Sequence, residues 1–158
     1  MQPDAINRLN PSAETIHVGS TEIKFLVTGA DSNGSVAIFE MAVPGGERIP
    51  SPFHSHDAYE ETIYGVEGVI TWTVNGVPID VAPGQTLCIQ RGEVHGFANH
   101  GAVDVRALAV VTPAVIGPEF FRAMSAIISA GLDVATMRAK MGETMRRHGL
   151  TPASPPAP

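Results

Sequence analysis

Three histidines and one glutamate have the residue types and the spacing of a metal site. His54 and His56 are two residues apart, so on a β-strand both imidazoles point to the same face. Glu61 can return to that face if a short irregularity at residues 57–58 precedes a regular strand, and His95 comes from a separate segment across a hairpin. Three imidazoles and one carboxylate suit one divalent transition metal per chain (Fe, Mn, Ni, Co, Cu or Zn).

The first two of these histidines and the glutamate lie in a segment that resembles the first signature motif of the cupin superfamily. That motif reads G(x)5HxH(x)3-4E(x)6G. Here His54 and His56 are followed by four residues, Glu61, six residues and Gly68. The sequence departs from the motif at its start, because Arg48 stands where the spacing requires the leading glycine. The departure concerns local backbone shape and leaves the ligand positions filled.

His95 lies in a segment that resembles the second cupin motif, G(x)5PxG(x)2H(x)3N. The matching residues in this chain are Gly84, Gly92, His95 and Asn99. Gln90 replaces the proline of the motif, which again affects a turn and not a ligand. With all four ligand positions filled, the two segments together predict a metal-binding barrel.

The resemblance implies an all-β fold, the cupin double-stranded β-helix (jelly-roll) barrel, here with C-terminal helices. One barrel followed by GPEFFR and MRRHGLTP is similar to the small quercetin 2,3-dioxygenase-like cupins. That likeness implies a mononuclear non-haem metal dioxygenase acting on a small oxygenated or aromatic substrate. Glu61 would then hold the metal and act catalytically by accepting a proton. Cupins with the same ligands also include isomerases, lyases acting on small acids or sugars, and non-catalytic binding proteins, so these alternatives stay open.

The rest of the chain predicts the strands that position the site. Short apolar segments recur every eight to twelve residues with turn signals between them, as in a sandwich or barrel. Asn75-Gly76, between segments 69–74 and 77–81, is the strongest two-residue hairpin signal. Further strands are expected at 22–28, 35–43, 61–68, 85–90, 94–99 and 103–111.

The composition changes after the barrel. We expect an N-terminal arm or edge strand over 1–20, the barrel over 21–115, a helical extension over 116–150 and a flexible tail over 151–158. Pro118 is a first-turn proline, and Phe120, Met124, Ile127 and Ile128 follow helical spacing. A second helix is predicted from Asp133 as N-cap to Gly149, with an apolar stripe of Val134, Met137, Met141 and Met145.

Several other side chains have predicted places. The candidate walls of a substrate pocket are Phe53, Ile63, Trp72 and Phe97. Glu60 is expected to face outward and be solvated, and Cys88 to be a small core residue. The isolated histidines His17, His100 and His148 are expected at the surface.

Charge and cysteine content exclude several classes of protein. The net charge is -6 with only ten Lys and Arg, which disfavours binding to nucleic acid or to an anionic membrane surface. The single cysteine permits neither an intramolecular disulfide nor a thiolate zinc cluster. A cytoplasmic protein with a small-molecule substrate is the expectation. We also expect a homodimer, because small barrels expose sheet edges that the arm or the first helix of a second chain could cover.

Overall fold

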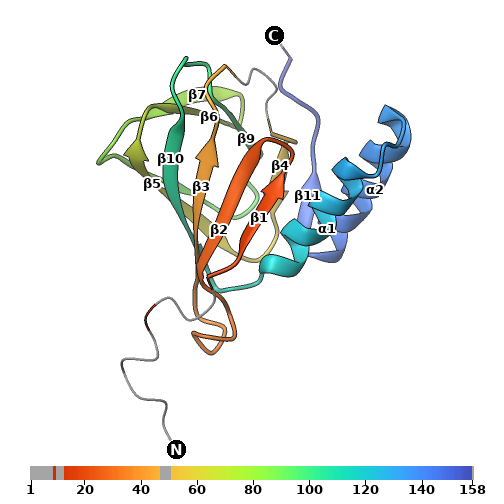
Figure 1. Cartoon of the computed structure of the whole chain (residues 1–158), viewed down its shortest axis with the longest axis horizontal. Helices are drawn as coiled ribbons and strands as arrows, with labels where there is room; N and C mark the ends of the chain where they lie inside the picture. Colours follow the sequence, from red (N-terminus) through yellow and green to blue (C-terminus); the bar gives the residue numbers. More distant parts are fainter. Residues whose placement is uncertain (1–8, 10–12, 47–50, 158) are drawn as a thin grey trace, which may run out of the picture.

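The computed structural model describes residues 9, 13–46 and 51–157, and all eleven strands of this described part belong to two antiparallel sheets (Figure 1). The six-stranded sheet contains, in spatial order, β1 (Thr15–Val18), β2 (Thr21–Val27), β3 (Ala37–Val43), β10 (Val105–Thr112), β5 (Glu60–Glu67) and β8 (Thr86–Ile89). The five-stranded sheet contains β11 (Leu150–Pro152), β4 (His54–His56), β9 (His95–Ala98), β6 (Ile70–Val74) and β7 (Val77–Val81). The predicted all-β architecture is confirmed as a jelly-roll sandwich.

The core lies between the two sheets. Alternate residues of each strand point inward, since successive side chains of a strand lie on opposite faces. In β3, Ala37, Phe39, Met41 and Val43 are buried while the residues between them are partly exposed. The same alternation in β4, β5 and β9 directs the predicted metal ligands into this interior.

The hairpin predicted at Asn75-Gly76 joins β6 to β7. Asn75 has φ 49° and Gly76 has φ 81°, and a two-residue turn with both φ values positive fits the right-handed twist of the paired strands. Because β6 also pairs with β9, this hairpin fixes the strand that carries His95.

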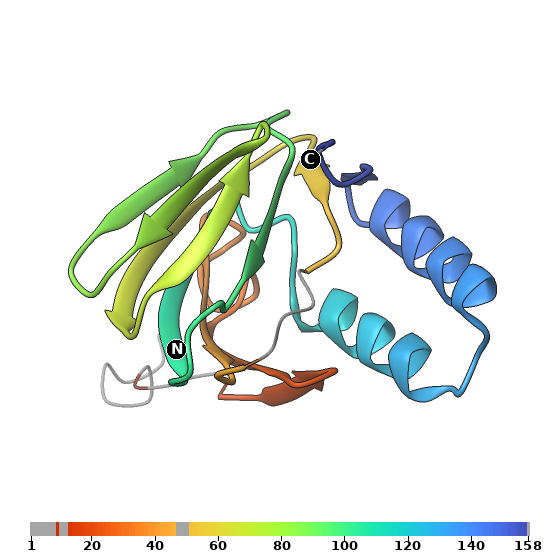
Figure 2. The same ribbon diagram turned by 90° about the horizontal axis from the view of Figure 1, so that it is seen from above.

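Two helices pack beside the sandwich, next to β1 and β11 (Figures 1 and 2). In α1 (Pro118–Ser129), Phe120 and Met124 are buried, and the Phe121 ring lies 5.2 Å from that of Phe39. The apolar stripe of α1 therefore covers its own barrel, and its two buried residues are not left for a second chain. In α2 (Val134–Arg147), the Asp133 side chain accepts a hydrogen bond from Thr136 N at 3.0 Å, as the predicted N-cap requires.

The structure agrees with the predicted edge strand near the N-terminus and differs from the predicted tail at the C-terminus. Part of the segment 1–20 is the edge strand β1, while residues 1–8 and 10–12 lie outside the described part of the chain, as does Arg48. At the other end, Thr151 and Pro152 belong to β11 and pair with Ser55 and His54. The predicted tail thus begins as a strand of the sheet that carries the histidines.

Cys88 is exposed, so its prediction as a core residue is wrong. The alternation of β8 explains the correction: Leu87 and Ile89 face inward, and the residue between them faces out.

The length and apolar character of the two helices bear on membrane insertion. Neither helix in the described ranges is long and apolar enough to cross a bilayer.

Candidate metal centre

The three predicted histidines converge between the sheets. His54 on β4 lies directly opposite His95 on β9, and His56 is the next residue of β4 that points the same way. The Nε2 atoms of His54 and His56 are 3.2 Å apart. One ring nitrogen from each of the three histidines lies within 4.8 Å of the others, a spacing that one metal ion could bridge.

Backbone carbonyls fix the ring orientation of two of these histidines. His54 Nδ1 lies 2.9 Å from the Pro52 carbonyl oxygen, and His95 Nδ1 lies 2.8 Å from the Glu93 carbonyl oxygen. A carbonyl oxygen only accepts, so each Nδ1 carries the proton and donates it. Each Nε2 then carries a lone pair and no proton, which is the tautomer that binds a metal through Nε2.

His56 is held differently. Its Nδ1 atom is buried without a hydrogen-bond partner, and its ring stacks on Tyr59 with ring centroids 4.2 Å apart and planes inclined by 20°. Stacking therefore takes the place of the second hydrogen bond that orients the other two rings.

Glu61 reaches the histidines from the opposite sheet. It is the second residue of β5, and its side chain is buried, with the whole residue 7% exposed. Its Oε2 atom lies 3.6 Å from His56 Nε2 and 3.6 Å from His95 Nε2. The irregular stretch after β4 thus lets Glu61 return to the histidine face. Its role as a fourth ligand stays a prediction.

Burial sets the protonation of the cluster. Desolvation, reinforced by the nearby His95, lowers the pKa of His54 to about 4. Desolvation also lowers the pKa of His56 to about 3, although the Glu61 carboxylate partly opposes it. Burial by itself would raise the pKa of Glu61, but the contacts with His95 and His56 outweigh it and hold this pKa below its usual value. At neutral pH His54 and His56 are therefore neutral imidazoles and Glu61 is a carboxylate, the forms that ligate metals.

The unpaired polar atoms of the interior support metal binding. Within the described ranges, four buried side-chain atoms lack a hydrogen-bond partner: His56 Nδ1, Tyr59 Oη, Trp72 Nε1 and His95 Nε2. All four belong to the histidine cluster or to aromatic rings next to it. Buried polar atoms are normally paired, and a metal ion bound at the cluster would pair at least one of these four. In particular, the His95 Nε2 lone pair fits a metal ion.

Three of the four predicted pocket residues lie on the histidine side of the sheets. Ile63 is buried on the same face of β5 as Glu61. The Trp72 ring lies 5.0 Å from that of Phe97 and 6.0 Å from that of His95. Trp72 therefore lies beside the cluster with Phe97 next to it, and the role of the three residues as walls of a substrate pocket stays a prediction.

The fourth, Phe53, is placed on the other face. A Cβ atom built on Gly96 would lie 3.2 Å from the Phe53 ring. Gly96 alternates with His95 along β9, so its substituent points away from the cluster. The prediction of Phe53 as a pocket wall is therefore corrected: the residue next to His54 in sequence faces the opposite side of the sheet.

The two residues that precede Glu61 in the sequence lie in different environments. Glu60 faces outward, as predicted, and is paired with Arg91 at 2.7 Å. Tyr59, which the sequence reasoning did not single out, is fully buried against His56. Burial raises the pKa of this phenol, which keeps it protonated.

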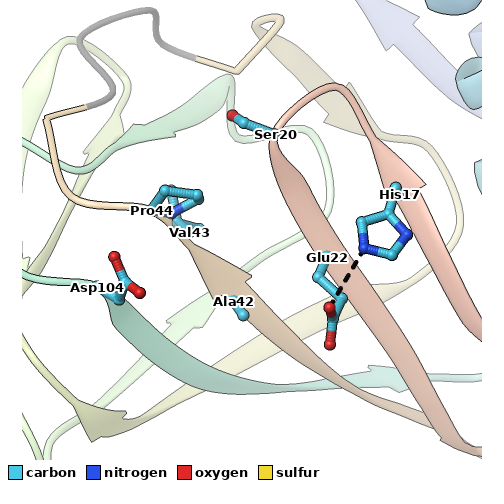
Figure 3. Close-up of a pocket in the computed structure, with 7 residues that line it drawn as sticks. All are labelled: His17, Ser20, Glu22, Ala42, Val43, Pro44 and Asp104. Carbon is cyan, nitrogen blue, oxygen red and sulfur yellow. Dashed lines mark ion pairs between the residues drawn. The ribbon is translucent and has the colours of Figure 1, made fainter.

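A hollow of about 200 Å³ on the outside of the six-stranded sheet is separate from this centre (Figure 3). Figure 3 shows His17 and Glu22 as an ion pair, with Nε2 3.3 Å from Oε2, and Asp104 across the hollow. The His17 side chain is 66% exposed, as predicted for a surface histidine. The hollow includes none of the predicted metal ligands.

Comparison with known proteins identifies the fold family. Residues 39–111, from β3 to near the end of β10, match the family model described as the cupin domain. This segment, a little under half of the chain, is similar to the cupin domain. The matched segment includes the strands β4, β5 and β9 that carry or precede His54, His56, Glu61 and His95. No curated protein matches the chain in sequence.

Solved cupin structures resemble the chain at low identity. A protein of Thermotoga maritima described as a predicted oxalate decarboxylase is 24% identical, with a TM-score of 0.57 over 66% of this chain and 96% of that one. A cupin sugar phosphate isomerase of Silicibacter pomeroyi is 17% identical, with a TM-score of 0.55 over 65% and 72%. The cupin domain of a transcriptional regulator of the XRE family from Enterobacter cloacae is 16% identical, with a TM-score of 0.52 over 60% and 97%. Likeness at these identities establishes the shared fold.

Proposed function

We propose that this cupin is a mononuclear non-haem metal dioxygenase acting on a small oxygenated or aromatic substrate, similar to the quercetin 2,3-dioxygenase-like cupins. The observation that carries the proposal is the convergence of three imidazoles on one point between the sheets, with the Glu61 carboxylate beside them. Four protein ligands leave one or two positions free on a five- or six-coordinate ion, which distinguishes such a centre from a closed structural site.

The residues of the site would have separate roles in such a reaction. A bound divalent metal would supply Lewis acidity and, for a redox-active ion, electron transfer. His54 and His95 hold their Nε2 lone pairs inward through hydrogen bonds to backbone carbonyls. Glu61 is ionised at neutral pH and can accept the proton of a substrate hydroxyl. Trp72 and Phe97 supply an apolar surface for an aromatic substrate.

The fold alone is compatible with other chemistry. The structural relatives are described as a decarboxylase, an isomerase and part of a regulator. A metal-dependent isomerase or lyase, or a binding protein without turnover, are therefore the alternatives that an experiment must distinguish.

Oxygen dependence separates these alternatives. Iron-loaded and manganese-loaded protein would be incubated with flavonols, catechols and β-diketones under air and under anaerobic conditions, while substrate loss and oxygen uptake are recorded. The proposal predicts turnover only under air, with oxygen consumed in proportion to substrate. Equal turnover without oxygen would indicate an isomerase or lyase, and binding without turnover would indicate a binding protein. Either result would contradict the proposal.

A further inference from the structure

Two aromatic hydrogen-bond donors next to the histidines lack acceptors. Tyr59 is 0% exposed and Trp72 is 2% exposed. The phenol oxygen of Tyr59 and the indole nitrogen of Trp72 are both buried without a hydrogen-bond partner. Buried tyrosine and tryptophan usually find such a partner, and a phenylalanine at either position would fill space without leaving a polar atom unpaired.

The two donors flank the histidine cluster. The Tyr59 ring stacks on His56 with centroids 4.2 Å apart, and the residue is fully buried. On the other sheet, Trp72 pairs with Phe97 in the β6–β9 register, and its ring lies 6.0 Å from that of His95. Two of the three histidines of the cluster therefore each have a neighbouring ring that carries an unpaired donor.

We infer that Tyr59 and Trp72 donate hydrogen bonds to oxygen atoms of the ligand that the histidine site holds. The inference rests on the proposed function and narrows its substrate class. A ligand that satisfies both donors carries acceptor oxygens close to the atom that the metal binds. Aromatic compounds with neighbouring hydroxyl or hydroxyl and carbonyl oxygens have this pattern, and their rings suit the surface of Trp72 and Phe97.

The test uses catechol and cobalt(II). Tyr59→Phe and Trp72→Phe each remove one donor and keep an aromatic ring. The matched control is Tyr64→Phe, which makes the same change at a residue of β5 that is 44% exposed on the outer face. Cobalt content is measured first, and catechol is then titrated into cobalt-loaded protein by visible absorption.

We expect cobalt content equal to that of the parent in all three variants. The dissociation constant for catechol should rise about tenfold in Tyr59→Phe and in Trp72→Phe, the effect of one typical hydrogen bond, and stay unchanged in Tyr64→Phe. Normal cobalt loading with unchanged catechol affinity in both donor variants would overturn the inference alone. A parent protein that binds no cobalt would overturn the proposed function as well.

A second measurement needs no metal. Because the Tyr59 hydroxyl has no partner within the protein, metal-free Tyr59→Phe should be at least as stable to urea as the parent, and as Tyr64→Phe. A clear loss of stability confined to Tyr59→Phe would show that the hydroxyl has an internal partner. That result would overturn the assignment of Tyr59 as a ligand donor, whatever the metal content.

Discussion

The stability of the metal-free protein should fall as the pH drops below the range where free histidine titrates. The pKa of His54 is lowered from 6.5 to about 4 and that of His56 to about 3, in both cases mainly by burial. Between pH 6.5 and about 4, the unfolded chain binds protons at these two residues and the folded chain does not. The unfolded state is therefore favoured as the pH falls, and the stability present above pH 6.5 is lost.

The pKa values set the size of this effect. At pH 5, a histidine with an unfolded pKa of 6.5 and a folded pKa of about 4 has lost about 2 kcal/mol of its contribution to the free energy of unfolding, relative to neutral pH. His56 contributes a similar amount, so together the two residues account for about 4 kcal/mol. This is a large part of the 5–15 kcal/mol that is typical of a whole domain.

Urea unfolding of the metal-free protein at pH 7.5 and pH 5.0 would measure this loss. His54→Gln removes one of the two titrating groups, so its loss between the two pH values should be smaller than that of the parent by about 2 kcal/mol. His17→Gln changes an exposed histidine and serves as the control, with a loss equal to that of the parent. Equal losses in the parent, His54→Gln and His56→Gln would refute the idea that these imidazoles are buried in the neutral form.

Three further predictions concern the carboxylate, the C-terminal strand and assembly. Glu61→Gln should bind metal more weakly and lose a further 10²–10⁴-fold in turnover per bound metal, the typical contribution of a general base; near-normal activity per metal in this variant would show that the carboxylate is not the base. The strand β11 pairs with all three residues of β4, whereas β9 pairs with β4 only at His54, so β11 holds the strand that carries His54 and His56 in place. A chain that ends at Gly149 lacks β11, and its cobalt affinity should fall at least about tenfold. Unchanged cobalt affinity would contradict this role of β11. Light scattering at micromolar concentration should show a homodimer, and a purely monomeric protein would contradict the expectation.

Local patterns predicted the features that depend on neighbouring residues. The Asn75-Gly76 turn has the positive φ values that its residue types permit, and the N-cap at Asp133 forms as its side chain allows. The alternation of β4 brings His54 and His56 to one face for the same reason. These features need no knowledge of distant segments, because the backbone periodicity of a strand or helix determines them.

The two wrong predictions, Phe53 and Cys88, concern which face of a strand a side chain lies on. Phe53 adjoins His54, but the alternation of a strand places its ring on the other face, against Gly96. Cys88 was judged by the apolar character of its strand, although it alternates with Leu87 and Ile89. Both corrections follow from strand parity, which was available in the sequence.

Two other features, the strand β11 and the position of Tyr59, depend on contacts between distant segments and could not be predicted from neighbouring residues. The strand β11 forms only because the two helices bring the chain back beside β4. Its own sequence is short and is followed by a proline-rich segment, so the sequence alone resembles a flexible tail. Tyr59 was missed because it precedes β5 in an irregular stretch, where strand alternation could not be assumed. The stacking of its ring on His56 appears only once β4 and β5 are placed in opposite sheets.

The most direct test of the metal site is the metal content of two single-histidine variants. Parent protein, His56→Ala, His95→Ala and the surface control His17→Ala would be dialysed against the same limiting concentration of cobalt(II), and bound metal would be measured by elemental analysis. We predict up to one cobalt per chain in the parent and in His17→Ala, and a large loss of cobalt in His56→Ala and in His95→Ala. Cobalt content equal to that of the parent in both of these variants would contradict the assignment of the histidine cluster as a metal site.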